Sequence, residues 1–225
     1  MNAANLAECL INYYPSEPLK TNLLFYLLNS LSHRECLSCD QISSRLGYSR
    51  EKLDELLNTI PAVETNEAGN IISAAGLSLR KTSYLIDCNK GPLYAQSGLD
   101  AVIVRTLLLT QMSVEHKCLD NHHPVCLRFG FDQAFMPLPD QAVITIPSRK
   151  ALLKNLHGNH SEYKLFPNPD SARRWLWQHE DGFILSVKNV FIAAVQLRQS
   201  LMRSSTSMLS APYRRKGSSA KRRKV

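Results

Sequence analysis

The sequence has no long apolar run. The longest, residues 101–109, is interrupted by Arg105 and falls short of the roughly 18 apolar residues that a transmembrane helix needs. The N-terminus has no basic segment and reaches Glu8 before any apolar stretch, which is unlike a secretory signal peptide. We therefore expect no membrane span and a cytoplasmic location.

Cysteine is too sparse for a scaffold held together by disulfides. Six cysteines are scattered over 225 residues, and apolar residues make up 44% of the chain, enough to bury a core without cross-links. We expect the thiols to be reduced. No cysteine follows Cys126, so the C-terminal part of the chain carries no thiol.

Acidic residues are absent from the C-terminal end. Residues 198–225 carry nine Lys or Arg and no Asp or Glu, whereas residues 1–75 carry five basic and nine acidic side chains. The formal net charge of +8 is therefore a property of the tail. Residues 204–225 are rich in Ser, Arg and Lys, which predicts a disordered basic tail able to bind nucleic acid or anionic lipid electrostatically.

Residues 1–75 have the pattern of a winged helix-turn-helix. Apolar residues recur there at helical spacing, and serines stand where helices would begin. The predicted elements are helices over residues 6–13, 20–32, 42–46 and 49–59, with Ser38 and Ser49 as N-caps, followed by two short β-prone pieces over residues 63–72. Three of these helices and the hairpin then make the winged fold.

The rest of the chain reads as a mixed sheet with helices. β-branched and aromatic residues predict strands over residues 77–88, 125–131 and 142–146, with a buried helix over 99–109 between them. Later patterns predict helices over 149–156, 171–179 and 191–202 and a strand over 183–187. Asp170 or Ser171 is expected to cap the helix at 171–179. The fold class is therefore α+β.

Two neighbouring segments carry the most specific motif. Residues 69–84 read Gly-Asn-Ile-Ile-Ser-Ala-Ala-Gly-Leu-Ser-Leu-Arg-Lys-Thr-Ser-Tyr, and residues 93–100 read Leu-Tyr-Ala-Gln-Ser-Gly-Leu-Asp. Together they resemble the signature of the organomercurial (alkylmercury) lyase family. The resemblance covers roughly residues 20–200 and continues at residues 114–118, Pro124-Val125, Trp175 and Ser186-Val187.

The resemblance also implies a domain organisation. Residues 1–75 would form a winged-helix-like N-terminal domain, and residues 76–203 an organomercurial-lyase-like mixed sheet with helices. Residues 204–225 would remain as the basic tail.

Members of this family cleave a carbon–mercury bond by protonolysis: two cysteine thiolates take the mercury, and an aspartate delivers a proton to the leaving carbon. By resemblance, Asp100 is that aspartate. Ser97 stands at the first cysteine position, and an ungapped count places His160 at the second. Mercury is soft and prefers thiolate, whereas a serine hydroxyl is hard and stays protonated near neutral pH. The sequence thus predicts a degenerate active site that binds a metal, an organometal or a small ligand without efficient cleavage.

Two alternatives remain open. Ser97, Asp100 and His160 could form a lyase or hydrolase site with altered chemistry if they converge, because hydroxyl, carboxylate and imidazole suit general-base catalysis or zinc. The chain could instead be a metal- or ligand-responsive winged-helix regulator that binds DNA. The acidic excess in the helix at residues 49–59 opposes phosphate contacts, so a structural role for that helix is the preferred interpretation.

A second candidate site lies in the predicted hairpin around residue 120. Five residues of metal-ligand type occur within eleven positions: His116, Cys118, His122, His123 and Cys126. Such density suits zinc or copper, although the spacing matches no known zinc finger. The alternative is a polar turn with a buried thiol, and the family resemblance implies that Cys118 is buried and non-catalytic. Zinc, copper and mercury are the candidate metals.

Overall fold

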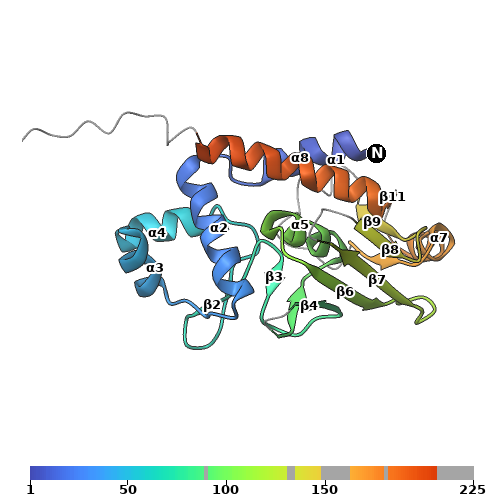
Figure 1. Cartoon of the computed structure of the whole chain (residues 1–225), viewed down its shortest axis with the longest axis horizontal. Coiled ribbons are helices and arrows are strands. Elements are labelled where there is room, and N and C mark those ends of the chain that lie inside the picture. The colour runs from blue at the N-terminus through green and yellow to red at the C-terminus, as the bar shows by residue number, and fades with distance from the viewer. Residues whose placement is uncertain (89–90, 131–134, 148–162, 180–181, 207–225) are drawn as a thin grey trace, which may run out of the picture.

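The computed structural model describes residues 1–88, 91–130, 135–147, 163–179 and 182–206 (Figure 1). The predicted helix over residues 149–156 lies outside these ranges. Within them, no helix is both long and apolar enough to cross a membrane.

The N-terminal helices form where the sequence places their caps. They are α1 (Ala3–Tyr13), α2 (Pro18–Ser32), α3 (Cys39–Leu46) and α4 (Arg50–Leu57). Ser38 and Gln41 form a capping box at α3, and Gly47 ends that helix in the left-handed conformation. Ser49 caps α4. These helix predictions are confirmed to within a few residues at each end.

A short hairpin follows α4, made of β1 (Glu64–Thr65) and β2 (Ile71–Ala74). Three helices and a hairpin are the parts that a winged helix requires, and the winged-helix assignment itself stays a prediction. On α4, Arg50 pairs with Asp54 and Lys52 with Glu55, so the cations of this helix already have acidic partners.

An antiparallel sheet of eight strands occupies the centre of the described chain, in the order β1-β2-β3-β5-β4-β6-β7-β8. A smaller sheet has the order β10-β9-β11. The remaining strands are β3 (Leu77–Ser78), β4 (Tyr84–Asp87), β5 (Leu93–Ala95), β6 (Met112–Lys117), β7 (Pro124–Phe129), β8 (Phe135–Leu138), β9 (Val143–Pro147), β10 (Leu165–Phe166) and β11 (Gly182–Ser186).

The expectation of one strand over residues 77–88 is wrong, because the chain forms β3 and β4 there instead. β5 lies between them and pairs with both, Ala95 standing opposite Leu77 on one side and Tyr84 on the other. A single strand could not have placed β5 in this way. The break is therefore set by pairing with a later segment, which local sequence does not encode.

Helix α5 (Gly98–Leu108) packs between the large sheet and the long C-terminal helix α8 (Val187–Thr206), beside which α1 lies (Figure 1). Ten of its eleven residues are buried, Leu108 being the exception. One hydrophobic cluster extends from Leu6 to Leu201 and includes residues from both proposed domains. The domain boundary near residue 75 stays a prediction. The burial of α5 fixes the position of its first turn.

Helix α7 (Pro169–Trp177) begins earlier than expected. The side-chain oxygen of Asn168 accepts a hydrogen bond from the Ser171 N–H at 2.9 Å, so Asn168 is the N-cap. Asp170 and Ser171, the predicted caps, lie inside the first turn. Pro169 favours this start because it suits the first helical position.

Replacing Asn168 with Ala should lower the free energy of unfolding by about 0.5–2 kcal/mol, because an N–H of the first turn loses its acceptor. The Asp170→Ala variant is the matched control. It removes an exposed ion pair with Arg173, and such pairs contribute about 0.3–0.5 kcal/mol. Urea unfolding of both variants checks the assignment, and a larger loss for Asp170→Ala would reverse it.

Candidate active site

Ser97 and Asp100 form a closed pair at the start of α5. Ser97 is the N-cap, and its Oγ accepts the Asp100 N–H at 3.0 Å. The same hydroxyl donates to Asp100 Oδ2 at 2.6 Å, near the short end of the range for O–H···O hydrogen bonds. Ser97 is fully buried and Asp100 is 6% exposed. The Ser97 hydroxyl is therefore hydrogen-bonded both to the backbone and to the side chain of Asp100.

The turn at Ala75-Gly76 brings the backbone against Asp100. Both residues have positive φ, 49° and 86°, and the turn joins paired strands β2 and β3, as in a type I′ hairpin. A Cβ built on Gly76 would lie 2.5 Å from the Asp100 side chain. The carbonyl of Gly76 also accepts the Gln96 N–H at 2.9 Å. Only glycine permits this approach, so Gly76 shapes the site.

Aromatic residues lie beside the carboxylate. Tyr13 and Tyr14, at the end of α1, line the same small space as Asp100 and Tyr163. Burial, and secondarily the nearby Asp100 charge, raises the pKa of Tyr13 and of Tyr14 above the ordinary tyrosine value. Both phenols are neutral at physiological pH. Each phenol can present its hydroxyl oxygen to a ligand but carries no charge.

The space beside Asp100 is small. Its volume is about 10 Å³, roughly what one water molecule needs. Its lining among the described residues includes no cysteine. His160, the third predicted site residue, lies outside the described residues. The described part of the site thus offers oxygen atoms in a closed pocket.

The residues of the hairpin between β6 and β7 point in different directions. His116 lies opposite Val125 on the buried face of the sheet, whereas Cys126 lies opposite Glu115 on the other face. Cys118 is buried in a small cluster with Phe166, and His122 and His123 are exposed. No group of three or more His, Cys, Asp or Glu in the described ranges is placed to hold a metal ion. The hairpin metal site stays a prediction.

His116 has a defined environment of its own. Its ring stacks on Tyr84 with centroids 4.3 Å apart, and Nδ1 lies 3.1 Å from the Ser83 carbonyl, to which it donates. Desolvation by burial lowers the pKa of His116; the carbonyl opposes this shift, and nearby Lys164 adds to it. The ring is accordingly neutral near physiological pH.

Several residues of this site, including Tyr13, Tyr14, Gly76 and Tyr163, were not found from sequence. Tyr13 and Tyr14 belong to a helix more than 80 positions before Asp100, and no local pattern links them to it. Gly76 does carry a signal, since glycine after alanine between two β-prone pieces is a turn pattern. That pattern indicates the turn but not its contact with Asp100.

The fold and the site define a mixed α+β protein with a buried acid in the first turn of its central helix. The family model for alkylmercury lyase, MerB, matches residues 77–199, more than half of the chain. The chain therefore belongs to the alkylmercury lyase family. The family resemblance of the sequence and the α+β fold class are confirmed.

Individual relatives agree with this assignment. An alkylmercury lyase of Bacillus cereus is 28% identical over 167 residues, covering 73% of this chain and 75% of the relative. One from Pseudomonas putida is 24% identical over 188 residues, covering 83% and 87%. The crystal structure of the mercury-bound form of MerB2 has a TM-score of 0.74 at 16% identity, covering 89% of this chain and 98% of that one. This last likeness concerns the fold alone.

Gly76→Ala should destabilise the protein more than Gly69→Ala. Both glycines have positive φ, so alanine costs roughly 1–2 kcal/mol at either position. Only at Gly76 would the new Cβ meet Asp100, whereas nothing lies within 4 Å at Gly69. The clash should add about 1–3 kcal/mol, measured by urea unfolding. Equal losses would show that the turn and the carboxylate are not in contact.

Stability should fall as the pH drops below about 6.5, the ordinary pKa of histidine. In that range unfolded His116 binds a proton while the folded, desolvated ring does not, so protons favour unfolding. His116→Phe keeps a ring against Tyr84 and should flatten the pH dependence between pH 7.5 and 5.5. Denaturant melts at each pH check this, with exposed His123→Phe as the control. An unchanged slope in His116→Phe would refute the assignment.

Proposed function

We propose that this member of the alkylmercury lyase family binds a metal, an organometal or a small ligand at the Ser97–Asp100 site and does not efficiently cleave carbon–mercury bonds. The single observation that carries the proposal is the Ser97 hydroxyl, bound to Asp100 at 2.6 Å where the family resemblance places a thiol.

Protonolysis needs two functions, a soft anion that holds mercury and an acid that protonates the leaving carbon. The described lining of the site contains Asp100 but no sulfur atom. A neutral hydroxyl is a poor ligand for a soft metal. The Ser97 hydroxyl also already donates its proton to Asp100, so a mercury ion would compete with an existing hydrogen bond.

The closed geometry further supports binding of a ligand small enough to enter beside the tyrosines. Tyr13 and Tyr14 belong to the last turn of α1 and the residue after it. Side chains at a helix end can be displaced more readily than those of its middle, because helix ends fray. A ligand that displaces them would meet the Asp100 carboxylate and phenolic oxygens together.

Methylmercury supplied with excess free thiol should release no methane above the protein-free reaction, measured by headspace gas chromatography. The reason is the missing thiolate pair, which leaves the carbon–mercury bond without the sulfur ligands that weaken it. Asp100→Asn is the matched variant, because it keeps the size of the side chain and removes the acid. Methane release that disappears in Asp100→Asn would contradict the proposal.

A further inference from the structure

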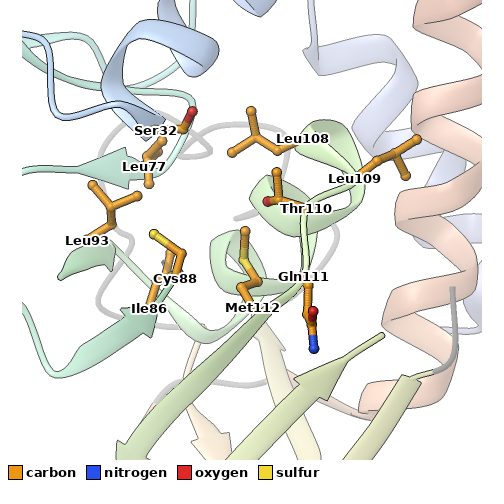
Figure 2. A pocket seen from close by; sticks show the side chains of 10 residues that line it. All are labelled: Ser32, Leu77, Ile86, Cys88, Leu93, Leu108, Leu109, Thr110, Gln111 and Met112. Atoms are coloured by element: carbon orange, nitrogen blue, oxygen red, sulfur yellow. The ribbon is translucent and has the colours of Figure 1, made fainter. Parts of the chain in front are cut away.

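A larger, mostly apolar pocket lies at the opposite end of α5. Its volume is about 200 Å³, and its lining comes from the end of α2, the strands β3 to β6 and the end of α5 (Figure 2). Leu108 is eight residues beyond Asp100, which places the pocket about 12 Å along the helix axis from that carboxylate. The pocket is therefore separate from the Ser97–Asp100 site.

The pocket suits a small hydrocarbon group. A buried apolar cavity of about 150 Å³ is enough to take up benzene. Apolar side chains form most of the lining: Leu77, Ile86, Leu93, Leu108, Leu109 and Met112. A phenyl or short alkyl group would replace water against these side chains, which favours binding by the hydrophobic effect.

Two sulfur atoms share this pocket. β4 ends at Asp87, which stands opposite Ser113 of β6, so Cys88 directly follows β4 at the end of the pair where Met112 begins β6, and both residues line the pocket. Figure 2 shows both side chains reaching into the hollow beside Ile86. A thiol and a thioether thus lie together in an apolar setting.

The thiol is within reach of solvent. Cys88 is half-buried, and with Gln111 and Met112 it also lines an adjoining open groove. Its Sγ donates a long hydrogen bond of 3.4 Å to the Gly91 carbonyl, a weak interaction that a ligand can replace. Among the six free cysteines, Cys88 is the one that lines this pocket.

We propose that the Cys88 pocket is a second ligand site, which takes up a soft cation carrying one small hydrocarbon group, the class that includes monoorganomercury ions. Uptake is a thiol exchange without oxidation or reduction. The mercury–sulfur bond to a small carrier thiol breaks, a mercury–sulfur bond to Cys88 forms, and the Cys88 proton passes to the released thiolate. The hydrocarbon fills the apolar lining, and the Met112 thioether supports the metal as a second soft ligand.

The ligand class follows from the family, and the site does not depend on the proposed role of Asp100. Cleavage needs an acid at the mercury-bound carbon, whereas this pocket's described lining has no acidic side chain. Cys88 would therefore hold the organometal intact.

The test is retention of phenylmercury by the full chain under a large excess of a small thiol, read by native mass spectrometry. Wild type and Cys36→Ser should each retain one equivalent of phenylmercury. Cys36 is exposed, so phenylmercury bound there would pass to the excess small thiol. Cys88→Ser should retain at least about tenfold less, since it loses the mercury–sulfur bond. Equal retention by Cys88→Ser, or its loss in Cys36→Ser, would overturn the proposal.

Two further variants separate a pocket from a merely reactive thiol. Ile86→Phe fills the cavity with the thiol intact, so phenylmercury retention should fall while methylmercury retention changes little. Met112→Leu keeps the volume and removes the thioether, and it should lower retention of both ligands. Wild-type behaviour in both variants would mean that Cys88 acts as an isolated thiol. Thermal unfolding of each variant confirms that it is folded.

Asp100→Asn distinguishes the two sites. It alters only the first site, so the equivalent of phenylmercury that Cys88→Ser loses should still be retained, whatever the outcome of the methane measurement. If retention is lost in Asp100→Asn and kept in Cys88→Ser, the ligand is held at the first site and the Cys88 proposal fails.

Discussion

The hydrogen bond between the Ser97 hydroxyl and the Asp100 carboxylate organises the site around it. It holds the carboxylate against the first turn of α5, where the helix dipole favours a negative charge. The turn at Gly76 can approach Asp100 only because glycine adds no side chain there, and Tyr13 and Tyr14 close the remaining side. The pocket is small because all of these groups meet at one carboxylate.

The same residue bears on both the fold and the proposed function. Serine is among the best N-cap residues, because its short side chain accepts a hydrogen bond from the first turn. Ser97 does so for the Asp100 N–H and thereby stabilises a helix that is buried along nearly its whole length. A hydroxyl in place of a thiol removes a soft metal ligand and leaves this helix start well capped. Under the proposed function, the fold would depend on the capping by Ser97, and the loss of activity on its lack of a sulfur atom.

Local sequence was sufficient where the determinants are local. As predicted, α3 begins at the Ser38 cap and ends at Gly47, and α4 begins at the Ser49 cap, because capping depends on a few adjacent residues. The start of α7 was predicted wrongly: three neighbouring residues, Asn168, Asp170 and Ser171, can each accept the cap hydrogen bond, and the geometry of Pro169 selects the first. Propensity alone does not rank such neighbours.

Features that depend on contacts between distant segments could not be predicted from local sequence. The division between β3 and β4 depends on β5 pairing with both strands. The cover over Asp100 depends on α1 packing beside α8, and the proximity of Cys88 to Met112 depends on the β4–β6 register. The family resemblance supplied the fold and Asp100, because a motif records a three-dimensional arrangement that local patterns do not.

The coupling of Ser97 and Asp100 into one hydrogen-bonded unit is the basis of the site. A double-mutant cycle of Ser97→Ala and Asp100→Ala, followed by urea unfolding, tests it most directly. Alanine at position 100 keeps the backbone N–H that Ser97 caps. Ser97→Ala therefore loses the cap hydrogen bond whether residue 100 is Asp or Ala, and that loss cancels in the cycle. The coupling energy then measures the hydrogen bond between the two side chains. The coupling energy between the two side chains should be about 0.5–3 kcal/mol. Losses that add to within about 0.3 kcal/mol would contradict it.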